Sequence, residues 1–348
     1  LDSIGFSLYY VWDRGLRDPA AQSAVMGLFR IDGMNLQALG IHVFERGWLS
    51  SNNILCVGDG DASLIDTGYV DHADQTASLV KTTLGEAPLV RLINTHLHSD
   101  HCGGNGRIQE AYPDSVTWVP RASFSAVQAW DQRRLTFEMT GQACARFLAH
   151  HPYSDGHVFQ LGGLAWSAHA AAGHDPEAML LFQPDNGILI SGDALWRNGL
   201  GVIFPELDGT DAFDDALKTL DLIESIDPKF VVPGHGPAFS DVEDAIMRAR
   251  TRIKRWAETP ETHSLYGLKV LVKFKLLSAQ RITLAALTQW ALATPYMRHL
   301  QTEAERLLQL DATTKSDQDR MSKVVEALVT RLVESGAAHV EDTMVVNA

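Results

Sequence analysis

The strongest signal in this chain is the segment Asn94-Thr95-His96-Leu97-His98-Ser99-Asp100-His101-Cys102-Gly103-Gly104-Asn105. Three histidines and one aspartate fall within six positions, directly after the apolar run LVRLIN. A chain of the same composition in random order would contain the pattern HxHxDH roughly 0.003 times, so a chance match is rare. Because residues two apart in an extended segment point the same way, His96 and His98 are predicted to bind one metal ion. Asp100 and His101 are predicted to face a neighbouring metal position.

Four ligands from one loop cannot complete two metal coordination spheres, so further donors from distant loops are predicted. Three candidates stand beside glycines where apolar runs end: His174 in AAAGHDPE, Asp193 in ILISGDALW and His235 in FVVPGHGP. Strand ends are where a rigid scaffold presents functional side chains. His169 is the alternative to His174 on the same run, and Cys102 is an alternative thiolate ligand. We predict that neither binds metal, because the other residues already supply the donors.

These motifs resemble, in order, the five motifs of the metallo-β-lactamase-fold hydrolase superfamily, over about residues 36–258. Asp66 in SLIDTGY matches the first motif, HLHSDH the second, Gly173-His174 the third, Asp193 the fourth and GHG at 234–236 the fifth. The resemblance implies an α/β fold, the αββα sandwich, with two metal ions at one edge of the sheets. It implies a first metal held by His96, His98 and His174, and a second held by Asp100, His101 and His235. Asp193 would bridge the two ions, and Asp66 would orient the metal-binding loop.

An aspartate at position 193 separates branches within that superfamily. The sequence is similar to the hydroxyacylglutathione hydrolase, lactonase and endoribonuclease branches, and a β-lactam substrate is not expected. Two metal ions about 3.5–4 Å apart would share a hydroxide that acts as the nucleophile at neutral pH. Asp193 and Asp100 are the predicted catalytic residues, with Asp100 also steering the proton. Zinc is the predicted metal, with iron and manganese as alternatives, because imidazole and carboxylate ligands accept all three.

The pattern along the chain predicts three parts: an N-terminal extension at 1–35, a hydrolase domain at 36–258 and a smaller domain at 259–348. Strand and helix patterns alternate in the hydrolase domain, with 121–150 expected to be helical. A long amphipathic helix from 241 is expected to break at Thr259 and Pro260. Helical stretches followed by a hairpin then predict a mostly helical, winged-helix-like C-terminal domain, similar to the tail of the endoribonuclease branch.

Charge and composition limit the partners of this chain of 348 residues, whose formal net charge is −14. Residues 1–240 carry 14 basic and 29 acidic side chains, whereas residues 260–348 carry 10 of each. We therefore expect no nucleic-acid partner and no contiguous basic groove leading to the metals. The run RARTRIKR at 248–255 is expected to be an interfacial helix, with phosphate contact as the alternative. The C-terminal domain at 259–348 is expected either to cap the cleft or to mediate dimerisation, so a homo-oligomer is one of the expected states.

No run of about 18 apolar residues occurs, so no membrane partner is expected. Three widely spaced cysteines without a CxxC pair favour a reducing compartment, and the cytoplasm is the predicted location. The first residue is Leu1 rather than Met, which fits a trimmed start or numbering from inside the gene.

Four aromatic residues are predicted to border the metal edge and to shape an apolar pocket, with plain core packing as the alternative: Trp130, Tyr153, Trp196 and Phe204. Arg133, Arg134 and Arg197 are candidates for contact with an anionic substrate, or parts of a solvated face. The predicted function is metal-dependent hydrolysis of an ester-like bond, a thioester or lactone, in a small molecule. The alternatives are a phosphodiesterase or endoribonuclease with the same metals, and an iron-dependent persulfide oxygenase that uses the first metal site only.

Overall fold

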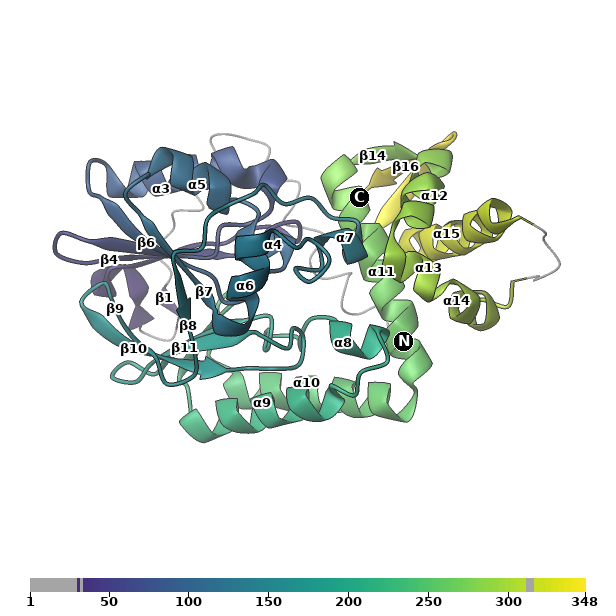
Figure 1. Ribbon diagram of the computed structural model, residues 1–348. Helices are drawn as coiled ribbons and strands as arrows, with labels where there is room; N and C mark the ends of the chain where they lie inside the picture. The colour runs from purple at the N-terminus through teal and green to yellow at the C-terminus, as the bar shows by residue number, and fades with distance from the viewer. Residues whose placement is uncertain (1–29, 32–33, 311–315) are drawn as a thin grey trace.

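Two β-sheets lie face to face in the computed structural model, which describes residues 30–31, 34–310 and 316–348 (Figure 1). The first sheet has the order β3 (Ile41–Phe44), β4 (Asn53–Val57), β5 (Ala62–Ile65), β6 (Leu89–Ile93), β7 (Val116–Pro120), β8 (His151–Tyr153). The second has the order β13 (Phe230–Pro233), β12 (Ile188–Gly192), β11 (Met179–Gln183), β10 (Leu164–Ala170), β9 (Val158–Leu161). A separate pair joins β1 (Arg30–Ile31) and β2 (Met34–Asn35).

Three apolar layers lie between the four successive layers of secondary structure, helix, sheet, sheet and helix. Residues such as Ile54, Ile93 and Trp166 fill the space between the sheets. On one side, α3 (Ala73–Leu84) and α5 (Asn105–Ala111) cover the first sheet. On the other side, α9 (Phe213–Ile226) and α10 (Val242–Glu258) cover the second sheet. The αββα arrangement expected from the sequence is therefore confirmed.

Parallel pairing brings functional loops to one edge of the sandwich. β5 runs parallel to β6 in the first sheet, and β12 runs parallel to β13 in the second. Because the carboxyl ends of parallel neighbours meet at the same edge, the loops after these four strands lie together. Three short helices accompany the strands and their loops: η1 (Leu36–Leu39), η2 (Val70–His72) and α4 (Ser99–Cys102).

The helix expected at 121–150 is wrong beyond its first part. Here α6 (Arg121–Ala129) is followed by Trp130, which adopts the left-handed conformation with φ 53°. A short α7 (Phe137–Thr140) follows and ends at Gly141. The chain then continues without helix, because its backbone N–H groups form hydrogen bonds with residues distant in the sequence. Leu148 N donates to Gln109 Oε1 at 3.0 Å, and His150 N donates to Thr117 O at 2.9 Å. These tertiary hydrogen bonds override the local pattern.

The C-terminal region is mostly helical and ends in a hairpin, as expected. After α10 ends at Glu258, it comprises α11 (Pro260–Ala279), α12 (Leu284–Ala293), α13 (Pro295–His299), α14 (Gln301–Leu307) and α15 (Asp317–Glu334). A small sheet has the order β14 (Arg281–Thr283), β16 (Met344–Asn347), β15 (Ala338–Glu341). The winged-helix assignment and the domain boundaries stay predictions, and residues 1–29 of the predicted extension lie outside the described residues.

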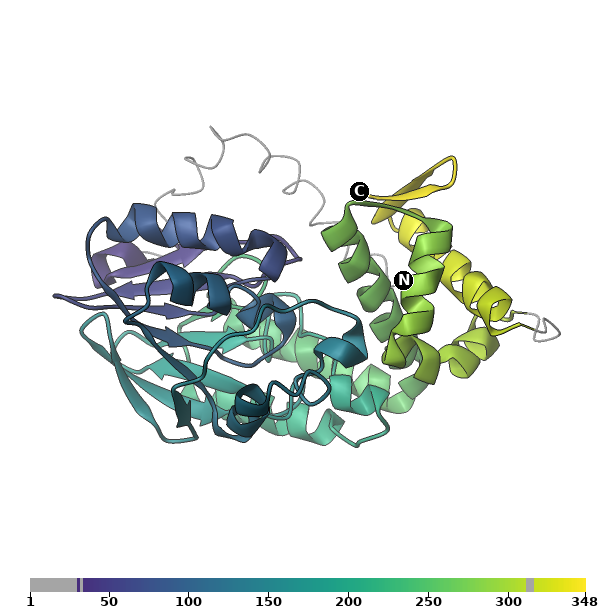
Figure 2. The same ribbon diagram turned by 45° about the horizontal axis from the view of Figure 1, so that its top comes forward.

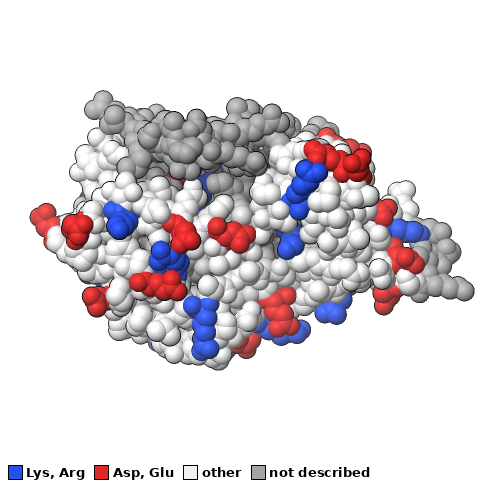
Figure 3. All heavy atoms as spheres, turned by 90° about the horizontal axis from the view of Figure 1, so that it is seen from above, with Lys and Arg blue, Asp and Glu red and all other residues white. Residues whose placement is uncertain are grey.

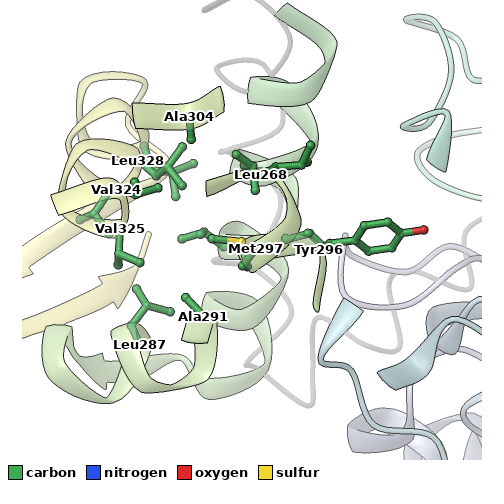
Figure 4. Close-up of a cluster of buried hydrophobic side chains, with 14 of the residues drawn as sticks. Leu268, Leu287, Ala291, Tyr296, Met297, Ala304, Val324, Val325 and Leu328 are labelled. Carbon is green, nitrogen blue, oxygen red and sulfur yellow. The ribbon is translucent and has the colours of Figure 1, made fainter. Parts of the chain in front are cut away.

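The C-terminal region has its own core and stands beside one end of the sandwich (Figures 2 and 4). Leu268, Met297 and Leu328 are fully or almost fully buried in that core. The loop that contains α8 (Phe204–Leu207) packs into the same core. The Tyr296 hydroxyl donates to Asp208 Oδ2 at 2.7 Å, so the sandwich and the tail share both apolar and polar contacts. Within the described residues, no helix is long and apolar enough to cross a membrane.

Candidate metal centre

Three buried histidines form a first group of donor atoms. His96 follows β6, His98 precedes α4, and His174 lies in the loop after β10. His96 Nε2 lies 3.1 Å from His98 Nδ1, which lies 2.8 Å from His174 Nε2. Burial lowers the pKa of His98 and of His174 to about 4, and it lowers the pKa of His96 well below its usual value. The three imidazoles are therefore neutral near pH 7, which is the form that binds metal.

Neighbouring groups fix the orientation of these rings. The carbonyl of Val202 can only accept, so His174 Nδ1 donates to it at 2.5 Å and leaves Nε2 free for a metal. His96 Nδ1 lies 3.2 Å from Thr95 Oγ1, and His98 Nε2 lies 3.4 Å from Asp175 Oδ2. A hydrogen bond at the far nitrogen of a ligating histidine sets both its tautomer and its direction.

A second group combines two aspartates and two histidines: Asp100, His101, Asp193 and His235. His235 Nε2 lies 3.0 Å from Asp100 Oδ2, and His101 Nε2 lies 3.2 Å from Asp193 Oδ1. Burial opposes charge on His101, but the Asp193 and Asp66 carboxylates outweigh it and hold its pKa well above the usual value. Burial likewise opposes charge on Asp193, but His101 and His235 hold its pKa well below the usual value.

Asp193 lies between the two groups. Its Oδ2 is 3.4 Å from His174 Nε2 in the first group and 3.7 Å from His235 Nε2 in the second. Gly234 makes room for it, because a Cβ on that residue would collide with Asp193 Oδ1. The carboxylate therefore lies close to histidines of both groups, and its bridging role stays a prediction.

Asp66, which follows β5, holds the metal-binding loop. It accepts from Thr95 N at 2.9 Å and from Thr95 Oγ1 at 2.7 Å. Its Oδ2 also lies 2.8 Å from His101 Nδ1, which must donate to the carboxylate. This bond directs His101 Nε2 toward Asp193, so the geometry is that expected of a residue that orients a ligand.

The residues present fit two divalent transition metals. His101 Nε2 is buried, and although it lies 3.2 Å from Asp193 Oδ1, it has no hydrogen bond of good geometry among the described residues. A metal ion would satisfy this atom, since imidazole and carboxylate donors suit zinc, iron and manganese. The donors within each group lie within 4.8 Å of one another, so each group surrounds one point.

A cavity of about 570 Å³ opens beside the two groups and extends to α10 and α11. Trp196 and Phe204 line it, as expected. Trp196 Nε1 donates to Asp193 Oδ1 at 3.2 Å, and the Phe204 ring centroid lies 5.0 Å from that of His98. Both aromatic side chains therefore border the metal centre and shape the cavity.

Trp130 and Tyr153 are not among the residues that line this cavity, so the prediction for them needs correction. Trp130 packs against Phe147, with ring centroids 5.5 Å apart. Tyr153 is buried in the sandwich core, and its hydroxyl donates to Asn94 O at 2.7 Å. Both residues pack against the strand and loop that carry the HxHxDH segment, on the side away from the cavity.

The two alternative ligands, His169 and Cys102, lie outside both groups of donor atoms. His169 is on β10, where its Nε2 lies 2.9 Å from Ser167 Oγ. Cys102 is buried, and its Sγ lies 3.8 Å from Cys144 Sγ.

The expectation that no basic groove leads to the metals is wrong for the wall of this cavity. Five basic residues of α10 and α11 line it: Arg248, Arg252, Arg255, Lys269 and Lys273. A net charge summed along the sequence could not predict this cluster of basic residues, because it does not show which side chains lie on the same face. Elsewhere, basic and acidic side chains are interspersed over the described part of the face in Figure 3.

The other arginines considered as substrate contacts do not line the cavity. Arg133 lies 3.6 Å from Glu138, and Arg197 lies 3.1 Å from Asp241. The first pair is largely exposed and the second is partly exposed, so both lie at the solvated surface.

Sequence reasoning missed two residues of the site. Trp48 lines the cavity and stacks on His235, with ring centroids 5.4 Å apart and an interplanar angle of 10°. Nothing in its sequence context distinguishes it from a core tryptophan. Asp175 lies beside His98, and its position directly after His174 was the available signal.

The chain thus folds as an αββα sandwich that carries two groups of His and Asp donor atoms. The metallo-beta-lactamase superfamily pattern matches residues 46–235, and the chain belongs to that superfamily. The chain is similar to an atrochrysone carboxyl ACP thioesterase of Cryptosporiopsis sp. (strain 8999), with 25% identity over 201 residues, 57% of this chain and 53% of the relative. It is also similar to a mitochondrial persulfide dioxygenase of Bos taurus, with 29% identity over 141 residues, 40% of this chain and 46% of the relative.

A solved metallo-beta-lactamase family protein from Thermus thermophilus shares the fold, with a TM-score of 0.52 and 16% identity. The match covers 89% of this chain and 99% of that one, so it extends beyond the sandwich. The chain spans about half the length of the curated relatives named above.

Proposed function

We propose that this protein is a dinuclear metal-dependent hydrolase that cleaves a thioester or lactone in a small molecule. His96, His98 and His174 would hold one metal ion, and Asp100, His101 and His235 the other, with Asp193 between them. The bound ions would generate hydroxide at neutral pH and polarise the carbonyl group under attack. The native metal is proposed to be zinc, with iron or manganese as alternatives.

The chain's own residues have distinct roles in this proposal. Asp66 and Val202 set the directions of His101 and His174 through the hydrogen bonds described above. Asp100, on the cavity side of the second group, would receive and pass on the proton. Trp196 and Phe204 exclude water from one side of the reacting carbonyl, because both line the cavity with apolar rings.

One observation carries the proposal: Asp193 lies within 3.4 Å of a histidine nitrogen in each of two complete donor groups. A single-metal protein would have no need of the second group. The similarity to a thioesterase supports an ester-like substrate. The cavity volume, about 570 Å³, is of the size that suits a small molecule.

The test has two stages. Elemental analysis of the metal-replete protein should give two transition-metal ions per chain, and one ion or none would exclude the dinuclear proposal. The loaded protein should then hydrolyse thioesters or lactones from a panel that also contains phosphodiesters. Cleavage of phosphodiesters alone would replace the proposed substrate class.

The basic wall of the cavity favours a second candidate, a phosphodiesterase or endoribonuclease that uses the same metals. Backbone recognition in such an enzyme would make cleavage fall steeply with salt, by about one log unit in binding per log unit of salt for each phosphate contacted. Salt-insensitive cleavage of a neutral ester would exclude it.

The similarity to a persulfide dioxygenase favours a third candidate, an iron-dependent oxygenase. Such an activity is expected to need the first donor group only. Variants His235→Ala and His174→Ala distinguish the two chemistries. A hydrolase should lose activity in both variants, whereas an oxygenase of this kind should lose it in His174→Ala alone.

A further inference from the structure

Two cysteines that the proposed hydrolysis does not use lie side by side next to the metal-binding loop. Cys102 is the last residue of α4, and Cys144 lies in the segment 141–150, which is described throughout and contains neither helix nor strand. Their Sγ atoms are 3.8 Å apart, although 42 positions separate the two residues in the sequence. Neither is among the described residues that line the cavity. The fold therefore creates a pair of thiols outside the site already assigned.

The thiols of this chain differ in their access to solvent. Cys102 is fully buried, whereas Cys144 is partly exposed. The residues on either side of Cys144, Ala143 and Ala145, are exposed, so a small solute can approach its sulfur. The third cysteine, Cys56, is fully buried on β4. Because access governs which thiols are oxidised, an oxidant from solution should react first at Cys144.

The backbone around Cys102 has little freedom to move. The two glycines that follow it pack onto the loop after β5, because a Cβ on Gly103 would lie 2.6 Å from Val70 N and a Cβ on Gly104 would lie 2.6 Å from Thr67 O. Both distances are shorter than a Cβ atom tolerates. Close backbone contacts of this kind hold the end of α4 in one place, and the Cys102 sulfur is held with it.

The segment that contains Cys144 is held at points on either side of this residue. Ala143 N donates to the Tyr69 hydroxyl at 3.0 Å, and Phe147 is buried in the apolar cluster that includes Cys102. The described residues between these points belong to no helix or strand. An S–S bond is about 2.05 Å long, so the two sulfurs must approach each other by about 1.8 Å. We assign this small movement to Cys144.

We propose that Cys102 and Cys144 are an oxidation site, at which hydrogen peroxide forms a reversible disulfide beside the donor groups. In the first step, the Cys144 sulfur attacks one peroxide oxygen and the O–O bond breaks, which gives a sulfenic acid and water. In the second step, the Cys102 sulfur displaces the hydroxyl group of the sulfenic acid, and the S–S bond forms. The thiol proton leaves with that hydroxyl group as a second water. Two thiols thus lose two electrons, and one peroxide is reduced to two waters.

The disulfide would tie the segment of Cys144 to the metal-binding loop. Cys102 directly follows His101 of the second donor group. Gln142, two positions before Cys144, lines the cavity and accepts a hydrogen bond from Ser99 Oγ at 2.5 Å. One oxidation would therefore restrain both the loop that carries donor residues and part of the cavity wall. This consequence follows from the covalent link itself and does not depend on which reaction the donor groups support.

Mass spectrometry of the full chain, purified with zinc, tests the proposal. After exposure to hydrogen peroxide, free thiols are captured with N-ethylmaleimide under denaturing conditions, and only that of Cys56 should remain. Digestion should give a peptide pair linked through Cys102 and Cys144 of the same chain, and dithiothreitol should restore both thiols. Amide hydrogen exchange of residues 141–150 should slow on oxidation and recover on reduction. Oxidation of Cys144 to sulfinic acid with Cys102 still reduced, or a link between two chains, would overturn the proposal.

Three variants assign the steps to the two residues, and the linked peptide of the wild type stands as evidence even if a variant does not fold. In Cys144→Ser, loss of the Cys102 thiol should slow by at least about tenfold, because the buried sulfur has no exposed partner. In Cys102→Ala, Cys144 should proceed to sulfinic acid, which dithiothreitol does not reduce. Cys56→Ser is the matched control and should form the disulfide at the wild-type rate. Loss of the Cys102 thiol at the wild-type rate in Cys144→Ser would refute the proposed pair.

Discussion

At the scale of single residues, the site depends on how each donor is held. Histidine can bind metal through either nitrogen, and here the partner of the other nitrogen decides which one is available. A carbonyl fixes His174 and a carboxylate fixes His101. Removing such a partner should therefore affect metal binding more than it affects the fold.

Asp193→Ala should lower kcat by more than about a hundredfold while the protein stays folded. The residue contacts both donor groups, and its loss would separate the two metal positions. Turnover assays, circular dichroism and metal content should be measured together. Asp185→Ala, in the turn between β11 and β12, is the matched control and should keep full activity. Normal turnover in a folded, metal-loaded Asp193→Ala protein would show that Asp193 is a turn residue only.

Asp66→Asn should weaken metal binding at the second group by about 10 to 100-fold, as is usual when the partner of a ligating histidine is lost. The amide can donate where the carboxylate accepts, so His101 would lose its fixed tautomer. Titration with a competing chelator should show one ion leaving early and the other unchanged. Equal loss of both ions, or of neither, would contradict the assigned role.

At the scale of elements, α11 links the tail to the metal centre. His263, in its first turns, is almost fully buried and accepts a hydrogen bond from Ile203 N at 3.1 Å. The adjacent Val202 carbonyl holds His174. The rings of Trp256 and Phe213 pack against His263 and help to shield it from water. The helix therefore supports the loop that orients a predicted ligand.

This burial predicts a pH dependence of stability. Burial lowers the pKa of His263 from 6.5 to about 4, so the folded state favours the neutral ring. Its contribution is fully present above pH 6.5 and is lost as the pH falls from 6.5 to about 4. Between pH 7 and pH 5, the free energy of unfolding of His263→Gln should fall by about 2 kcal/mol less than that of the wild type. Denaturant titrations of both metal-loaded proteins measure this, and parallel pH profiles would refute it.

At the scale of the whole molecule, the metal centre lies where three parts of the chain meet. The first sheet supplies the HxHxDH loop, the second supplies Asp193 and His235, and α11 closes the cavity. Tyr69, in the loop after β5, packs against Phe274 of α11, with ring centroids 5.1 Å apart. Metal binding should thus stabilise the assembly of all three parts.

Removal of the metals should lower Tm and abolish activity together. A ligand that binds only the folded state at a free concentration of 100 Kd adds about 2.7 kcal/mol, so each of two sites should contribute on this order. Calorimetric melts with chelator, and after zinc is restored, provide the measurement. Restored zinc should increase the free energy of unfolding of the wild type by the contributions of two sites, and that of Asp66→Asn by less. A Tm that does not respond to zinc would mean that the donor groups bind no metal in the folded protein.

The sequence alone was enough to predict the sandwich and the donor residues that the structure brings together in two groups. Metal chemistry restricts the residue types, and short strands that end in Gly, His and Asp place them, so HLHSDH, Asp193 and His235 could be identified without coordinates. Other features could be seen only in the folded protein. Three features depend on contacts between segments far apart in the chain: the packing positions of Trp130 and Tyr153, the end of the helix at 129, and the basic wall of the cavity. Local sequence patterns cannot indicate those contacts, whereas a metal motif such as HLHSDH can be identified because its residues are close together in the sequence.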